Sequence, residues 1–368
     1  MTYPKPTPLV ASLPATVPFV GPETQERARG AAFNARLGAN ENVFGPSPKA
    51  VAAMQAAASE AWMYADPEHH ALKQALGAHH GIGSDEFVIG EGIDGLLGYL
   101  VRIYVGHGDA VVTSDGAYPT FNYHVAGFGG TLHKVPYKDD HEDLAALTAK
   151  VLETNAKLVY LSNPDNPMGT WHPAQDVVAF AQNLPPTCLL VLDEAYIDTA
   201  PAGTAPAIGE TPPNVIRMRT FSKAYGLAGA RVGYAIGAPR VVSEFAKIKN
   251  HFGMSRPGLA AALGALQDQD YLGKTLEAVE NSRKSIAEIA TANGLQPLAS
   301  ATNFVAIDCG QDGAFAKRVL QSLIEQGVFV RMPFVAPQDR CIRISCGTDA
   351  DLLHFKNALP HALTSAQS

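Results

Sequence analysis

The sequence predicts an α/β protein, with a large domain on a mostly parallel sheet and a smaller α+β domain at the C-terminus. Between residues 87 and 218, short unbroken apolar runs alternate with helical patterns. Strands of this kind belong to parallel sheets that helices cover on both faces. From about residue 255, long amphipathic stretches precede further short strands. We therefore predict an N-terminal arm at residues 1–36, a large domain at 37–255 and a small domain at 256–368.

The composition is globular and excludes several classes of function. The chain has 368 residues, and this length is more than one minimal core requires. Hydrophobic residues make up 46% of the chain and charged residues 17%. The formal net charge is −7 without a basic tract, so we expect no nucleic-acid partner. No apolar run could span a bilayer and no signal-like segment opens the chain, so we expect no membrane association and a cytoplasmic location.

The four cysteines predict free thiols. They form no C-x-x-C pair and each lies in or beside an apolar run: Cys188, Cys309, Cys341 and Cys346. Such residues are typical of buried thiols in a reducing compartment. We predict no metal site.

The first elements are an arm, a loop and a helix. Six prolines within residues 1–30 predict an extended arm that lies on a partner subunit, closes a site or forms a free tail. A polar loop with Asn40 follows, which is either ordinary turn chemistry or part of a site. Ser47 before Pro48 predicts a helix N-cap and first helical residue, with the helix ending near residue 59.

The remaining elements follow from the alternating pattern. Strands are predicted at 87–89, 110–113, 131–135, 158–161, 188–192 and 215–218, and helices at 68–79 and 93–105. In the C-terminal part, strands are predicted at 303–308, 328–331 and 341–345, and helices within 259–292 and at 314–325 and 349–363. Ligands of such sheets bind beyond the carboxyl ends of the strands. Five of these strand ends carry polar or aromatic residues, which we expect to converge on one crevice.

Two strand ends and a nearby arginine could bind a phosphate group. Gly92-Ile93-Asp94 opens a helix, where backbone N–H groups and the helix dipole favour an anion. Thr220 and Ser222 are hydroxyl donors, and Arg231 is a fork-shaped cation. Each feature alone would also fit an ordinary turn, but together they predict a phosphate cradle.

Other strand ends supply groups for a flat ring. Asp193 directly follows an apolar run, and as a buried carboxylate it needs a cationic partner. Tyr196 and Asn166 could donate hydrogen bonds into the same crevice, and Phe121 could stack on a ring. Lys223 lies among hydroxyls and glycines after a buried strand, an unusual place for a long cation.

This combination of groups matches pyridoxal 5′-phosphate. Lys223 would form an imine (Schiff base) with it, and Asp193 would pair with the protonated pyridine nitrogen, which keeps the ring an electron sink. Tyr196 and Asn166 would bond its phenolate oxygen. Once substrate displaces Lys223, the amine would serve as general base and acid in the proton transfer. We therefore assign catalytic roles to Lys223, Asp193 and Tyr196.

Three segments resemble the fold-type I pyridoxal-phosphate aminotransferases, class I/II: SNPDNPMGT, VLDEAYID and TFSKAYGLAGARVGY. LGANENVFGPSP, GVFVRMPF and CIRISCGT are similar to the histidinol-phosphate aminotransferase branch. The resemblance covers nearly the whole chain from residue 37. It implies an aspartate-aminotransferase-like fold with a seven-stranded sheet, and a homodimer that transfers an amino group from a small-molecule donor, such as histidinol phosphate, to 2-oxoglutarate.

The resemblance also implies roles for individual residues. Tyr64 should reach across a dimer interface to the neighbour's cofactor phosphate. Arg343 should bind the carboxylate of the amino donor, Arg331 should lie at the distal end of the substrate, and Asn40 should lie near the carboxylate or the entrance. Phe121 falls where the family places its stacking ring, with Tyr118 and Tyr123 as competitors.

Some positions depart from the pattern of the branch. Met168 replaces a threonine, Val43 replaces a proline, and the segment MPFVAP is apolar where polar residues are usual. An apolar distal pocket would suit hydrophobic substrates. Three alternatives therefore stay open: an aromatic amino acid aminotransferase, a decarboxylase of threonine-phosphate type, and a non-enzymatic member. The residues do not identify the physiological donor or acceptor, or the role of the arm.

Overall fold

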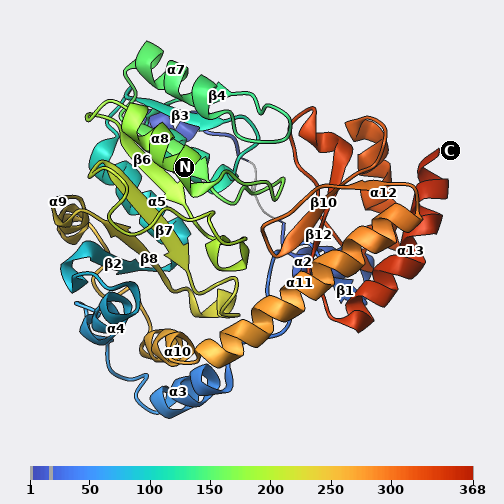
Figure 1. Cartoon of the computed structure of the whole chain (residues 1–368), viewed down its shortest axis with the longest axis horizontal. Coiled ribbons are helices and arrows are strands. Elements are labelled where there is room, and N and C mark those ends of the chain that lie inside the picture. The colour runs from blue at the N-terminus through green and yellow to red at the C-terminus, as the bar shows by residue number, and fades with distance from the viewer. Residues whose placement is uncertain (1–2, 16–19, 368) are drawn as a thin grey trace.

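The computed structural model of the chain describes residues 3–15 and 20–367 (Figure 1). Its large sheet has seven strands in the order β2-β8-β7-β6-β5-β3-β4, which confirms the predicted α/β class. The strands are β2 (Phe87–Gly90), β3 (Ala110–Ser114), β4 (Thr131–Val135), β5 (Leu158–Ser162), β6 (Leu189–Asp193), β7 (Val215–Thr220) and β8 (Gly233–Gly237). Neighbouring strands are parallel except at β8, which runs antiparallel to both β2 and β7.

Strand β8 is the element of the large sheet that the sequence pattern missed. Its five residues, GYAIG, include two glycines and follow β7 without an intervening α-helix. The prediction relied on alternating apolar strands and helices, and β8 breaks that alternation. A glycine is required at Gly233 by close packing, because a Cβ there would lie 2.9 Å from the backbone carbon of Gly92.

Both faces of the large sheet are buried, as the unbroken apolar runs predict. On β5, Leu158 and Tyr160 belong to one core cluster, whereas Val159 and Leu161 belong to another. Helices α5 (Gly92–Tyr104) and α6 (Pro119–Gly127) contribute to the first cluster. Helices α7 (Leu144–Thr154) and α8 (Ala174–Asn183) contribute to the second. This layering leaves the strand ends as the accessible edge.

The helices α3 (Pro48–Ala58), α4 (His70–His80) and α10 (Arg256–Leu266) lie together near β2 (Figure 1). The Ser47 hydroxyl accepts a hydrogen bond from the amide of Ala50 (3.1 Å), which confirms the predicted N-cap. Helix α4 begins later than predicted, because the Asp66 carboxylate accepts bonds from the amides of Glu68 and His70 and holds the preceding turn.

The C-terminal part has its own sheet and core. Strand β10 (Phe304–Asp308) pairs antiparallel with β12 (Cys341–Ser345) and β9 (Gln296–Pro297), and β1 (Ala35–Arg36) pairs parallel with β11 (Val328–Phe329). Its helices are α11 (Gln269–Ala292), α12 (Gly313–Glu325) and α13 (Asp349–Gln367). Figure 1 shows α11 running from the large sheet to this second unit. The domain boundaries stay a prediction.

The described part of the arm is only partly extended, which corrects the sequence prediction. It contains α1 (Pro8–Ser12) and α2 (Pro22–Arg29), each with proline in the first turn, where its missing N–H group costs no hydrogen bond. Residues 1–2 and 16–19 of the predicted arm lie outside the described residues. The remaining helical segments are α9 (Pro239–Val242) and 3₁₀ turns at Ser84–Glu86, Ile197–Thr199, Ala228–Ala230, Ser243–Lys247 and Gln338–Arg340.

The four cysteines are buried free thiols, as predicted. Within residues 3–15 and 20–367, no helix combines the length and apolar character needed to cross a membrane. The same residues contain no group of three or more histidine, cysteine, aspartate or glutamate side chains that could hold a metal ion.

We expect the Ser47→Ala variant to lower the free energy of unfolding by about 1 kcal/mol, because it removes the N-cap of α3. The measurement is the midpoint of urea unfolding. Ser59→Ala is the matched control on the same helix. Its exposed hydroxyl donates only to the carbonyl of Ala56, so we expect little change. Equal shifts for the two variants would contradict the capping role.

Candidate active site

A cavity of ≈ 380 Å³ lies at the carboxyl ends of β5, β6 and β7. The last residues of these strands, Ser162, Asp193 and Thr220, all line it. Twelve of the predicted site residues line this cavity: Asn40, Ile93, Asp94, Asn166, Asp193, Tyr196, Thr220, Ser222, Lys223, Arg231, Arg331 and Arg343. The expected convergence of strand ends on one crevice is therefore present, and the C-terminal part of the chain supplies Arg331 and Arg343, the two arginines predicted to bind substrate.

Lys223 lies just beyond β7 and points toward the loop at Asn40. Its ammonium group donates a hydrogen bond to the carbonyl of Asn40 (3.0 Å) and lies 5.4 Å from the centre of the Tyr196 ring. The Asn40 side chain donates to the Tyr196 hydroxyl (3.0 Å), and the Asn166 amide approaches the same hydroxyl at 3.5 Å. The lysine and both predicted hydrogen-bonding residues thus face one space.

Asp193 is a buried carboxylate, only 3% exposed. Its two oxygens accept hydrogen bonds from the Tyr160 hydroxyl (2.6 Å) and the Ala195 amide (2.9 Å). Burial raises the pKa of Asp193 to about 6, although these two hydrogen bonds oppose the rise. Among the described residues, no lysine or arginine forms an ion pair with Asp193.

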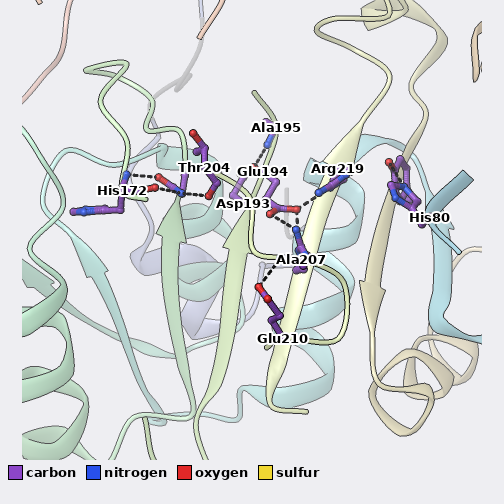
Figure 2. A network of polar contacts seen from close by, with 12 residues as sticks. His80, His172, Asp193, Glu194, Ala195, Thr204, Ala207, Glu210 and Arg219 are labelled. Atoms are coloured by element: carbon purple, nitrogen blue, oxygen red, sulfur yellow. Dashed lines mark hydrogen bonds and ion pairs between the residues drawn. The ribbon is translucent and has the colours of Figure 1, made fainter. Parts of the chain in front are cut away.

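The next residue, Glu194, pairs with the nearby cationic side chains. It forms ion pairs with Arg217 (2.8 Å) and Arg219 (2.8 Å) on β7. Burial opposes ionisation of Glu194, but the two arginines hold its pKa below its usual value. Figure 2 shows Asp193 and Glu194 next to each other, with the ion pair between Glu194 and Arg219 as a dashed line. The Asp193 charge is therefore left for a group bound in the cavity.

The predicted phosphate residues are adjacent in the structure. The Thr220 and Ser222 hydroxyls are 2.9 Å apart, and Arg231 donates to the Ser222 hydroxyl (3.4 Å) and the Glu91 carbonyl (3.3 Å). Gly92, at the first position of α5, has φ 75°, and a Cβ there would lie 2.3 Å from an Arg231 guanidinium nitrogen. The glycine therefore makes room for the arginine at the helix N-terminus, an arrangement suited to an anion.

Arg331 and Arg343, the arginines predicted to bind substrate, lie next to each other across a backbone bridge. Arg343 donates to the Asn166 side chain (2.5 Å) and to the Gly38 carbonyl (3.3 Å), and burial lowers its pKa to about 10. Arg331 donates to the carbonyl of Val20 in the arm (2.7 Å). The arm therefore contacts the rim of the cavity.

Three predicted cofactor residues lie outside the cavity lining: Gly92, Phe121 and Tyr64. Phe121 is fully buried and stacks on Tyr160, with ring centres 4.8 Å apart, so its prediction as the stacking ring is wrong in this structure. It is the third residue of α6 and packs in the core between helix and sheet, whereas Tyr118 precedes the helix and lines the cavity. Tyr64 is 75% exposed and packs against Phe252.

Sequence reasoning missed several residues that support the site. Ser345, on β12, accepts from the Asn40 amide (3.0 Å) and donates to the Asn40 side chain (2.9 Å), which fixes Asn40 at its left-handed φ of 55°. Asn303 donates to the Asn40 carbonyl (3.1 Å). Tyr160 donates a hydrogen bond to Asp193. A tyrosine among the aliphatic residues of β5 is the sequence feature that could have identified it.

Comparison with known proteins agrees with this geometry. The family model for aminotransferase class I and II matches residues 35–359. The chain is 32% identical over 366 residues to histidinol-phosphate aminotransferase from Moorella thermoacetica, covering 98% of this chain and 94% of that protein. It is 56% identical to histidinol-phosphate aminotransferase from Sinorhizobium meliloti in complex with pyridoxal-5′-phosphate, with a TM-score of 0.96 and 99% of both chains covered.

A more distant structure shows the fold alone. Aspartate aminotransferase from Thermus thermophilus superposes with a TM-score of 0.80 at 22% identity, covering 98% of this chain and 97% of the other. This likeness confirms the predicted aspartate-aminotransferase-like architecture.

We expect Asp193→Asn to stabilise the protein without cofactor more at pH 8 than at pH 4.5. Because burial raises the Asp193 pKa from 3.8 to about 6, ionisation costs folding free energy as pH rises through this range. The neutral amide avoids a cost on the order of 1–3 kcal/mol at pH 8. Thermal unfolding at the two pH values measures it. A wild-type midpoint at pH 8, or an equal gain at both pH values, would contradict the buried charge.

Proposed function

We propose that this chain, which belongs to the class I and II aminotransferases, transfers an amino group between histidinol phosphate and 2-oxoglutarate with pyridoxal 5′-phosphate as its cofactor. The observation that carries the proposal is the cavity with Asp193, Lys223 and Arg231 at three separate places around it. The Asp193 carboxylate would pair with the ring nitrogen of this cofactor, the Lys223 amine would form the imine, and Arg231 would bind the phosphate group. The names of the relatives support amino transfer rather than the decarboxylation kept as an alternative.

The residues present fit the cofactor. Its phosphate group would lie at the N-terminus of α5, among Thr220, Ser222 and Arg231, where backbone N–H groups, hydroxyls and a guanidinium group meet. Asp193, a buried carboxylate without a protein cation, would hold the proton on the ring nitrogen. Tyr118 is the aromatic side chain available for the ring face. When bound, the cofactor withdraws electrons from the carbon that bears the transferred amino group.

Lys223 would anchor the cofactor covalently and then move the proton. Its amine lies within hydrogen-bond distance of the Asn40 carbonyl, so it is held inside the cavity. A positioned amine of this kind can take a proton from substrate and return it, which is worth roughly 10²–10⁴ in rate. Tyr196 and Asn166 lie on the same side, where they would bind the ring oxygen.

The other end of the cavity suggests how the substrates bind. Arg343 is partly buried and oriented by Asn166, so it would bind a carboxylate of 2-oxoglutarate or glutamate. Arg331 would bind the phosphate of histidinol phosphate, and Met332, Pro333 and Phe334 would contact the imidazole. Asn40, which contacts both Lys223 and Tyr196, would border the substrate carboxylate or the entrance.

We further propose a cytoplasmic homodimer. Tyr64 is exposed beside two other exposed aromatic side chains of the same region, Trp62 and Phe252, and a second copy of the chain would cover them. In that arrangement Tyr64 would reach the neighbour's cofactor phosphate. The four buried thiols support a reducing compartment.

A substrate panel tests the proposed reaction. Histidinol phosphate, phenylalanine, tyrosine and histidine are each offered with 2-oxoglutarate, and glutamate formation is measured. We expect the highest kcat/KM with histidinol phosphate. Arg331→Gln should reduce that preference, because it removes the cation proposed for the phosphate, while leaving the aromatic substrates less affected. Release of CO₂ without any need for 2-oxoglutarate would overturn the proposal.

Lys223→Ala should abolish amino transfer and leave the cofactor bound without a covalent link. The loss should be at least about 10²-fold, because it removes the positioned proton donor and acceptor. Borohydride reduction followed by mass spectrometry reports the covalent link. Lys49→Ala is a control at an exposed lysine that pairs with Asp268, and it should behave as wild type. Normal turnover of Lys223→Ala would rule out the proposed role.

A further inference from the structure

Tyr160 lies beneath the cavity and contacts Asp193 from the middle of a neighbouring strand. In the register of β5 and β6, Tyr160 pairs with Val191 and Ser162 pairs with Asp193. Tyr160 and Asp193 are therefore diagonal neighbours on one face of the sheet, within reach of a long side chain. The Tyr160 hydroxyl donates to the Asp193 carboxylate at 2.6 Å. A distance this short is typical of a hydrogen bond to a charged acceptor.

The Tyr160 side chain is held rigidly in this position. It is fully buried, and its ring stacks on Phe121 at 4.8 Å with an interplanar angle of 19°. Burial raises the pKa of the Tyr160 phenol further above its usual value, so the hydroxyl stays protonated and can only donate to the carboxylate. Phe121, which the sequence placed against the cofactor, instead supports the residue beneath it.

The surroundings of Asp193 make this donor important. Three further charged groups that act on Asp193 are acidic: Asp94, Glu194 and Glu142. Glu194 is neutralised by its two arginines, and Asp94 accepts from the Tyr118 hydroxyl. Tyr160 is the one side chain among the described residues that donates a hydrogen bond to Asp193. Without it, the backbone amide of Ala195 would be the remaining protein donor.

We propose that Tyr160 is a positioning residue that fixes the plane of the Asp193 carboxylate and keeps it ionised for the cofactor ring nitrogen. The inference rests on the proposed function, because it assigns Asp193 to that nitrogen. Two fixed donors, Tyr160 and Ala195, each occupy one oxygen of the carboxylate, so it cannot rotate when the cofactor leaves or enters. The site is therefore pre-organised for the cofactor before binding.

The test is the affinity of cofactor-depleted protein for pyridoxal 5′-phosphate, measured between pH 6 and 8.5 by fluorescence titration. We expect Tyr160→Phe to bind the cofactor about tenfold more weakly at pH 7.5, the loss typical of one hydrogen bond to a charged group. Loss of the donor favours protonated Asp193, so the pH below which affinity falls should move upward by about one unit.

Tyr137→Phe is the matched control. The Tyr137 hydroxyl donates to the buried carboxylate of Asp165 (2.8 Å), so the variant removes the same atom from the same kind of bond. Neither Tyr137 nor Asp165 lines the cavity. We expect the control to lose thermal stability, as Tyr160→Phe does, but to keep the wild-type cofactor affinity and its pH profile.

The outcomes separate this inference from the proposed function. The inference would be overturned if Tyr160→Phe kept the wild-type cofactor affinity and pH profile, or if Tyr137→Phe lost as much cofactor affinity as Tyr160→Phe. The proposed function would still stand in either case, provided that the wild-type protein transfers amino groups. Failure of the wild-type protein to bind the cofactor would overturn both the inference and the proposed function. If circular dichroism shows that Tyr160→Phe does not fold, Phe121→Leu decides. Loosening the stacked ring should then weaken cofactor binding in the same direction, and an unchanged affinity would overturn the inference.

Discussion

A single negative charge, buried at the end of β6 without a protein cation, is the constraint around which the site is arranged. Asp193 follows four buried aliphatic residues, and a carboxylate in such surroundings is costly to ionise. The next residue along the chain, Glu194, forms ion pairs with Arg217 and Arg219, so these two cations are engaged away from Asp193. The Asp193 carboxylate therefore lines the cavity without a protein cation, and this favours binding of a cationic ring there.

The reversed strand β8 gives the other half of the site its rigidity. Residues 221–232 connect β7 to β8, which are antiparallel neighbours, so both ends of this segment are fixed to the same sheet edge. Lys223 and Arg231 therefore lie on a short, doubly anchored connection instead of a long crossover. Arg231 has a left-handed φ of 54°, and Gly92 leaves space for its guanidinium group. A helix crossover at this point would have separated the lysine from the phosphate cradle.

The C-terminal part lines the cavity with Arg331 and Arg343 and also holds the Asn40 loop in place. Asn40 is held by Ser345 and Asn303 on one side and contacts Lys223 and Tyr196 on the other. Arg343 lies on the same strand as Ser345, so the proposed carboxylate site and the Asn40 loop are coupled through β12. Any relative motion of the two parts would therefore move both Arg343 and the Asn40 carbonyl, which accepts from Lys223.

The sequence alone determined the features that depend on local chemistry. Unbroken apolar runs identified six of the seven large-sheet strands, Ser47 and Pro48 marked the start of α3, and the strand ends gave Asp193, Lys223 and the phosphate residues. Tertiary structure decided whatever depends on register or on which way a side chain turns. It placed Tyr118 in the cavity and Phe121 in the core, left Asp193 without a cation, and brought Tyr160 diagonally beneath it. The physical reason is that a hydrogen-bond partner on a neighbouring strand is set by the pairing of residues distant in the chain, and no local pattern records that pairing.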